Sequence, residues 1–131
     1  MSERATERAT DRPKILFVDD DPQLLAGLRS VLRADRARWD ISFAQGSDEA
    51  LAQLAAARYD AVVSDMRMPG LDGAELLALV KQRVPAARRV ILSGSADSDD
   101  ALRASAIADA VLTKPCPVRE LRAANERLLA T

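Results

Sequence analysis

The class of fold can be predicted from one stretch near the N-terminus, Lys14-Ile15-Leu16-Phe17-Val18-Asp19-Asp20-Asp21-Pro22. Residues 15–18 are all apolar and include β-branched and aromatic side chains, which is typical of a strand buried on both faces of a parallel sheet. Three acids follow this run, and Pro22 is a residue that helices tolerate in their first turn. The stretch therefore predicts a strand that ends at Asp19, a short acidic loop, and a helix capped by Asp21.

Similar apolar runs recur along the chain. They lie at residues 39–44, 61–64, 90–92 and 111–113. Segments with apolar residues at helical spacing lie between these runs and after the last run, and they predict helices. Ser47 is expected to cap the second helix, and Asp72 and Glu75 have the spacing of a capping box for the third. Five strands alternating with five helices predict the α/β class, as a doubly wound, five-stranded parallel sheet with helices on both faces, the flavodoxin-like arrangement.

Length and charge limit the domain organisation and the function. The 131 residues suit one compact domain, with residues 1–13 expected to be a mobile tail and residues 14–131 the folded domain. Residues 1–12 alternate acids and bases without an apolar run, so they predict neither a signal peptide nor a membrane anchor, and the expected location is the cytoplasm. Lys and Arg number 19 against 20 Asp and Glu, which leaves no basic field to attract nucleic acid or an anionic membrane.

Several other residues have plain structural explanations. The chain has one cysteine and no histidine, so it can form no intramolecular disulfide and lacks the commonest zinc ligand and catalytic base. Cys116, between two prolines, is expected to be a small packing residue rather than a nucleophile. Trp39 is expected to fill the core or an interface, and Arg88 and Arg89 are expected to be solvated where the fourth strand begins.

Polar residues follow four of the predicted strands at the points where those strands end. They are Asp19 and Asp20, Asp65, Ser93 and Lys114. The carboxyl ends of parallel strands share one edge of a sheet, where such folds bind ligands. Two carboxylates about 4 Å apart repel by roughly 4 kcal/mol at an effective dielectric constant of about 20. We therefore expect a bound cation to offset the repulsion among these acids. Oxygen ligands without His or Cys suit Mg²⁺, with Mn²⁺ as the alternative ion.

Four motifs, in this order, resemble the receiver (CheY-like) domain of response regulators in two-component signalling. They are Phe17-Val18-Asp19-Asp20-Asp21-Pro22, Ser64-Asp65-Met66-Arg67-Met68-Pro69-Gly70-Leu71-Asp72-Gly73, Leu92-Ser93-Gly94 and Thr113-Lys114-Pro115. The resemblance covers roughly residues 14–129. Any one motif alone would be a weak signal, whereas four at consistent spacing make a strong one.

The resemblance implies a role for each site residue. Asp65 would be the phosphoacceptor, and the metal would be bound by Asp20, Asp65 and the backbone carbonyl of Arg67, with Asp19 assisting through water. Ser93 would be the switch hydroxyl and Lys114 would contact the phosphoryl oxygens. Pro115 would follow a cis peptide bond. Such a domain is no enzyme with a separate substrate, because it catalyses only its own phosphorylation and dephosphorylation.

The resemblance also implies partners. The phosphoryl group would come from a histidine kinase or a histidine phosphotransfer protein, and phosphorylation would repack the face of the fourth helix, fifth strand and fifth helix toward a downstream protein or output domain. Val111 departs from the family, because many receivers carry an aromatic ring there that moves inward with the switch hydroxyl. Three motifs further resemble receivers that precede HDOD or HD-type output domains: Trp39-Asp40, Leu92-Ser93-Gly94 and Lys114-Pro115-Cys116-Pro117. The chain is therefore expected either to act on a partner in trans or to be part of a longer regulator.

Two other functions remain as alternatives. Asp19-x-Asp21, Ser93 and Lys114 also resemble a haloacid-dehalogenase-like phosphohydrolase, but the acidic pair expected after the lysine is missing and residues 65–70 stay unexplained. Phosphoryl transfer to Asp19 rather than Asp65 would favour that enzyme. A phosphorylation-independent binding module with the receiver fold would usually have lost a key residue, and none is lost here.

Overall fold

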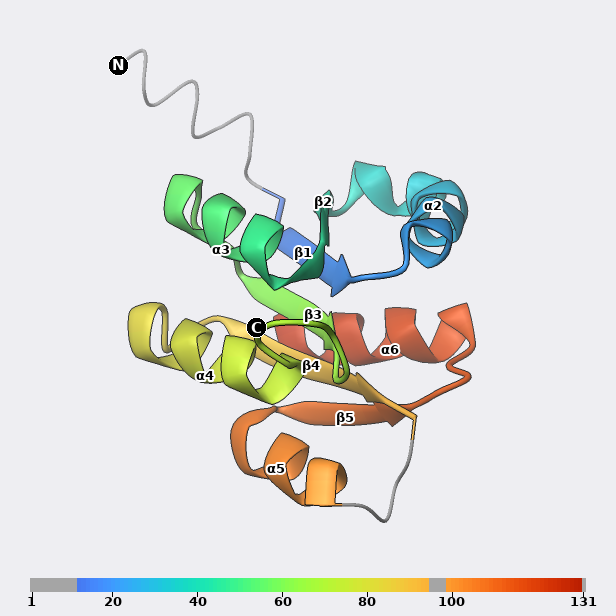
Figure 1. Ribbon diagram of the computed structural model, residues 1–131. Coiled ribbons are helices and arrows are strands. Elements are labelled where there is room, and N and C mark those ends of the chain that lie inside the picture. Colours follow the sequence, from blue (N-terminus) through green and yellow to red (C-terminus); the bar gives the residue numbers. More distant parts are fainter. Residues whose placement is uncertain (1–11, 95–98, 131) are drawn as a thin grey trace, which may run out of the picture.

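The computed structural model describes residues 12–94 and 99–130 (Figure 1). Most of the tail predicted at residues 1–13 lies outside these ranges. Of its two described residues, Arg12 donates to the carbonyl of Arg36, and the Pro13 carbonyl accepts a 2.9 Å hydrogen bond from the Asp40 amide.

Strands and helices alternate along the described chain, as predicted. The strands are β1 (Lys14–Asp19), β2 (Asp40–Gln45), β3 (Ala61–Asp65), β4 (Arg88–Ser93) and β5 (Ala110–Thr113). The helices are α2 (Pro22–Val31), α3 (Gly46–Ala56), α4 (Gly73–Arg83), α5 (Asp99–Ile107) and α6 (Val118–Leu129), with a 3₁₀ helix, η1 (Leu32–Ala37), after α2. The strands form one parallel sheet in the order β2-β1-β3-β4-β5, which confirms the predicted doubly wound fold.

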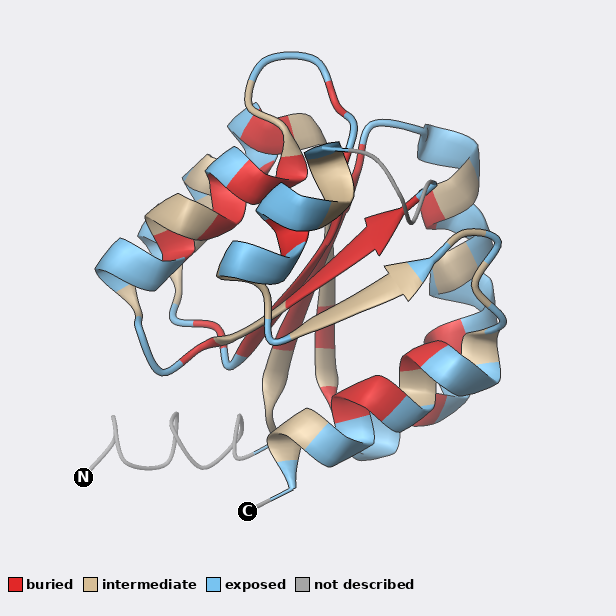
Figure 2. Ribbon diagram, turned by 90° about the horizontal axis from the view of Figure 1, so that it is seen from below, coloured by how far each residue is buried: buried red, intermediate tan, exposed pale blue. Residues whose placement is uncertain are grey.

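The core has two layers because successive strand residues point to opposite faces of the sheet. Leu16, Val62 and Ile91 pack on the face covered by α3, α4 and α5. Their neighbours Phe17, Val63 and Val90 pack on the other face, under α2 and α6, together with the buried Trp39. Figure 2 shows the result, with buried central strands and helices that are buried only on their inner sides.

Two of the three predicted helix starts are confirmed. The Asp21 carboxylate accepts hydrogen bonds from the amides of Gln23 and Leu24 at the start of α2, and Asp72 and Glu75 form a reciprocal capping box at α4. The prediction for Ser47 is wrong. Helix α3 begins one residue before it, at Gly46, and Ser47 is buried inside the first turn, while the Glu49 carboxylate accepts from the Gln45 amide at 2.8 Å.

The prediction for Arg88 and Arg89 is also wrong, because both side chains are partly buried. The Arg88 guanidinium donates to the Leu128 carbonyl at 3.0 Å, and that of Arg89 donates to the Ile107 carbonyl at 2.8 Å. These carbonyls lie at the C-terminal ends of α6 and α5, where the last backbone acceptors have no partner within the helix. Consecutive strand residues thus cap helices on opposite faces of the sheet.

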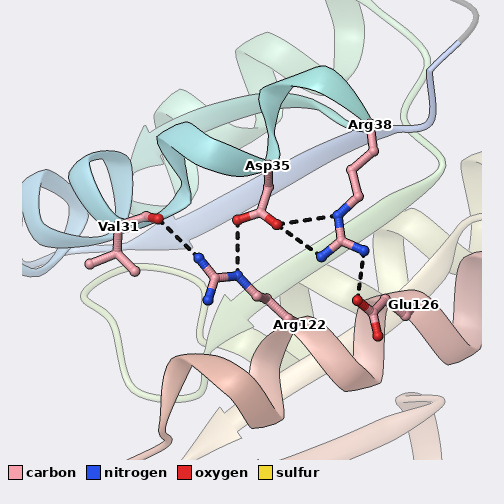
Figure 3. Close-up of polar contacts among 5 residues, drawn as sticks. All are labelled: Val31, Asp35, Arg38, Arg122 and Glu126. Atoms are coloured by element: carbon pink, nitrogen blue, oxygen red, sulfur yellow. Dashed lines mark hydrogen bonds and ion pairs between the residues drawn. The ribbon is translucent and has the colours of Figure 1, made fainter.

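An ion-pair cluster joins η1 to α6 (Figure 3). We call it the Asp35 clamp, and it comprises Asp35, Arg38, Arg122 and Glu126. The buried Asp35 carboxylate accepts from Arg38 Nη2 at 2.8 Å and from Arg122 Nε at 2.9 Å. Arg38 also reaches Glu126 at 2.6 Å, and Arg122 reaches the Val31 carbonyl at 3.1 Å. The clamp therefore fixes α6 against the connection between α2 and β2.

Candidate functional site

The predicted acids meet at the carboxyl edge of the sheet. Asp19 ends β1 and Asp65 ends β3, and these strands are hydrogen-bonded neighbours. One carboxylate oxygen from each of Asp19, Asp20 and Asp65 lies within 4.8 Å of the others. Asp19 and Asp65 are buried, at 3% and 7% exposure, whereas Asp20 is exposed. The cluster therefore faces solvent on one side only.

Asp19 is held by the backbone on one oxygen and lacks a hydrogen bond on the other. Its Oδ1 accepts from the Asp21 amide at 2.9 Å, while its buried Oδ2 accepts no hydrogen bond from the described residues. Burial, together with repulsion from Asp65 and Asp20, raises the pKa of Asp19, although the Asp21 amide and Lys114 oppose the shift. A buried carboxylate oxygen without a donor, next to two more carboxylates, suits a hard cation or its bound water.

Lys114 supplies the positive charge. It follows β5, and its Nζ lies 2.9 Å from Asp65 Oδ1 and 3.8 Å from Asp19 Oδ2. Its amide donates to the Ser93 carbonyl at 2.8 Å, which extends the pairing of β4 with β5. Burial lowers the pKa of Lys114, but the hydrogen bond to Asp65 and the attraction of the three acids outweigh burial and leave the pKa raised. The Lys114–Pro115 peptide bond is cis, as predicted.

A cavity of about 380 Å³ opens over Asp65. Ser93, buried at the end of β4, lines it beside Gly94 and Lys114. The cavity thus brings together a carboxylate, a hydroxyl and an ammonium group from the ends of three different strands. An anion bound there would find hydrogen-bond donors, and a carboxylate oxygen there could attack an electrophile.

The loop after Asp65 packs against the start of α4. The Gly73 amide donates to the Met66 carbonyl at 2.7 Å, and the Met66 amide donates to the Leu92 carbonyl at 2.9 Å. A Cβ at position 73 would collide with the Asp65 carbonyl oxygen and lie 3.0 Å from Met66 Cα. Only glycine allows this approach, so Gly73 sets how closely α4 can approach the acids.

Asp100 is a residue of the cavity that the sequence did not predict. It comes from the first turn of α5, lines the cavity, and pairs with Arg67 Nη2 at 2.7 Å. The sequence shows Asp99 and Asp100 only as acids before a weak helix, where acids are common. No local pattern indicates that Asp100 faces the end of β3.

The structure brings together Asp19, Asp20, Asp65, Ser93 and Lys114, which are all five predicted rim residues. Arg67 lies at the same edge, but its side chain is 82% exposed and pairs with Asp100.

Cys116 is partly buried against the core, and its pKa is raised by burial and by Glu120, which fits a packing residue. None of the described helices has both the length and the apolar composition needed to cross a lipid bilayer.

Comparison with known proteins points to one family. The model of the response regulator receiver domain matches residues 15–126. The transcriptional regulatory protein PrrA of Mycobacterium leprae is 35% identical over 118 residues, which cover 89% of this chain and 50% of PrrA. The sensor histidine kinase TmoS of Ectopseudomonas mendocina is 29% identical over 92% of this chain and 12% of its own length. The chain therefore spans half or less of these relatives.

Solved structures give the same result. The signal receiver domain of an HD domain-containing protein from Pseudomonas fluorescens Pf-5 is 32% identical, with a TM-score of 0.83 over 90% of this chain and 94% of that one. It corresponds to the subgroup that the sequence resembles. The response regulator TrrA of Thermotoga maritima, solved in complex with Mg²⁺ and BeF, is 28% identical, with a TM-score of 0.77 over 89% of this chain and 99% of that one.

Proposed function

Because the chain belongs to the family of response regulator receiver domains, we propose that Asp65 is its phosphoacceptor and that Lys114 and Ser93 bind the phosphoryl group. The observation that carries the proposal is the 2.9 Å pair between Lys114 Nζ and Asp65 Oδ1 beside two further carboxylates. A turn aspartate with a purely structural role would not need a buried acid and a lysine at the same place.

The residues suggest how the transfer proceeds. An Asp65 oxygen attacks the phosphorus of a donor phosphohistidine, so that a P–O bond forms while the P–N bond breaks and the imidazole leaves with the electron pair and takes up a proton. Lys114 moves from Asp65 Oδ1 to a phosphoryl oxygen, and Ser93 donates its hydroxyl to another. The product is an aspartyl phosphate, and hydrolysis of this bond returns the domain to its resting state.

Receiver domains bind a divalent cation in an acidic pocket, and the acids described above fit one. We propose Mg²⁺, or Mn²⁺ in its place, held by Asp20, Asp65 and the backbone carbonyl of Arg67, with Asp19 contributing through water. A cation there would offset the negative charge on the transferring oxygens. Asp19 Oδ2 supports this assignment, because it is buried and accepts no hydrogen bond from the described residues, and a buried carboxylate oxygen needs a partner.

Receiver domains work with histidine kinases and output domains. We propose that a histidine kinase or a histidine phosphotransfer protein phosphorylates this chain in the cytoplasm, and that it signals to a protein rather than to nucleic acid. Its output surface would be α5, β5 and α6, the face that the family uses. Val111 on β5 is partly buried and aliphatic, so the coupling to this face would not use an aromatic ring at that position.

Incubation with acetyl phosphate and Mg²⁺, followed by intact mass measurement and peptide mapping, tests the proposal. We expect one acyl phosphate on Asp65, labile in both strong acid and base, and none in Asp65→Asn. Modification of Asp19 instead would favour the hydrolase alternative. Millimolar Mg²⁺ should also raise the melting temperature of the metal-free protein, because a ligand that binds only the folded state stabilises it, and Asp20→Asn should abolish this rise.

A further inference from the structure

Asp100 places a negative charge in the cavity that the proposed phosphoryl group must enter. The other lining residues lie at the ends of β3 and β4 or shortly after the ends of β3, β4 and β5, whereas Asp100 reaches in from α5. Its carboxylate is only 19% exposed, so solvent screens its charge incompletely. An approaching phosphodonor is itself an anion, so the Asp100 carboxylate makes the cavity less favourable for it than a neutral side chain would.

Asp100 also pairs with a guanidinium group that lines the same cavity. Asp100 Oδ2 lies 2.7 Å from Arg67 Nη2, and Asp100 Oδ1 lies 3.4 Å from Arg103 Nη1. Arg103 continues to Asp72, the N-cap of α4, at 2.8 Å. We call this chain of charges, Arg67, Asp100, Arg103 and Asp72, the α5 latch. It ties the first turns of α5 to the loop after β3.

The ion pairs of the latch are weak enough for its side chains to exchange partners. The Arg67 side chain is 82% exposed and that of Arg103 is 45% exposed, and ion pairs between exposed groups contribute little to stability. A phosphoryl group carries nearly two negative charges and three acceptor oxygens, and guanidinium groups bind such oxygens in pairs. Arg67 lines the same cavity as Asp65, so it can reach an anion bound there.

We propose that Asp100 is a positioning residue that slows phosphorylation of Asp65 by repelling the donor and sequestering Arg67. When the phosphoryl group arrives, Arg67 exchanges Asp100 for the phosphoryl oxygens, and the freed Asp100 loosens the first turn of α5. This inference rests on the proposed function. It gives the site a charge-based connection to α5 that needs no aromatic residue at position 111.

Phosphorylation kinetics test the inference with Asp100→Asn and a matched control, Asp99→Asn. Both acids lie in the first turn of α5, so both substitutions remove the same favourable charge from the helix N-terminus. With acetyl phosphate and Mg²⁺ at low salt, we expect Asp100→Asn to react about three- to tenfold faster than the wild type and Asp99→Asn to change less than about twofold. Screening should shrink the gain at high salt. The double variant Asp100→Asn/Arg67→Gln should lose most of the rate gain that Asp100→Asn shows over the wild type.

Hydrogen–deuterium exchange of the peptide covering residues 99–107 is the second readout. Phosphorylated wild type and unphosphorylated Asp100→Asn should both exchange faster there than unphosphorylated wild type and Asp99→Asn. If the wild type is phosphorylated but Asp100→Asn matches Asp99→Asn in rate and exchange, the inference is wrong and the proposed function stands. If the wild type takes up no phosphoryl group, both fail.

Discussion

Replacing Asp35 with Asn is expected to lower the free energy of unfolding by about 2–3 kcal/mol, although the residue lies outside the proposed site. Asp35 is 6% exposed and accepts three hydrogen bonds, from Arg38 Nε at 3.2 Å, Arg38 Nη2 at 2.8 Å and Arg122 Nε at 2.9 Å. Asn has nearly the same shape but no charge, and its amide nitrogen cannot accept. One guanidinium group must then face a donor.

The magnitude follows from burial. Removing one partner of a buried ion pair typically costs about 3–5 kcal/mol, because the other charge stays behind unpaired. Here the Arg38 and Arg122 side chains are 42% and 32% exposed, so water recovers part of the loss. The remaining 2–3 kcal/mol corresponds to a fall in melting temperature of roughly 10 °C for a domain of this size.

Urea and thermal unfolding at neutral pH, in metal-free buffer, measure the effect. Glu126→Gln is the matched control, since Glu126 binds the same Arg38 but is 51% exposed, and we expect it to lose less than about 1 kcal/mol. The reasoning is refuted if the two variants are equally stable. An unchanged urea dependence (m-value) in Asp35→Asn would show that the denatured state is not the cause.

Three further outcomes are expected. Asp19→Asn should stabilise the metal-free protein by about 1 kcal/mol at neutral pH, because it removes one of three clustered charges. The folded-state pKa of Asp19 is raised, so its charge destabilises the fold increasingly as pH rises through that pKa. In thermal melts below the ordinary pKa of 3.8, the stability difference between Asp19→Asn and the wild type should therefore vanish. Gly73→Ala should destabilise the protein by about 1–3 kcal/mol in urea titrations, because its Cβ meets the Asp65 carbonyl, whereas Gly27→Ala, with open space around it, should not. Asn125→Leu should raise the melting temperature, because buried polar atoms without hydrogen bonds destabilise a fold. Asn125 is 1% exposed, and its side-chain oxygen and nitrogen form no hydrogen bond with the described residues. A lower melting temperature would contradict this and would fit a buried water bound to Asn125.

The doubly wound parallel sheet and the polar residues at its carboxyl edge could be predicted from local sequence patterns. Runs such as residues 15–18 are local, and so are the caps at Asp21 and Asp72, because each depends on neighbours within a few positions. The topology of parallel strands then requires that Asp19, Asp65, Ser93 and Lys114 share one edge. Their roles remain proposals, but their meeting place was predictable.

The charge pairs between distant parts of the chain could not be predicted in this way, because they depend on the packing of the helices. Arg122 meets Asp35 from 87 positions away, and Asp100 meets Arg67 because α5 packs beside the loop after β3. Likewise, Arg88 and Arg89 cap helices that end far along the chain. A long side chain can reach several partners, and which one it finds depends on how the helices pack on the sheet, which no local pattern encodes.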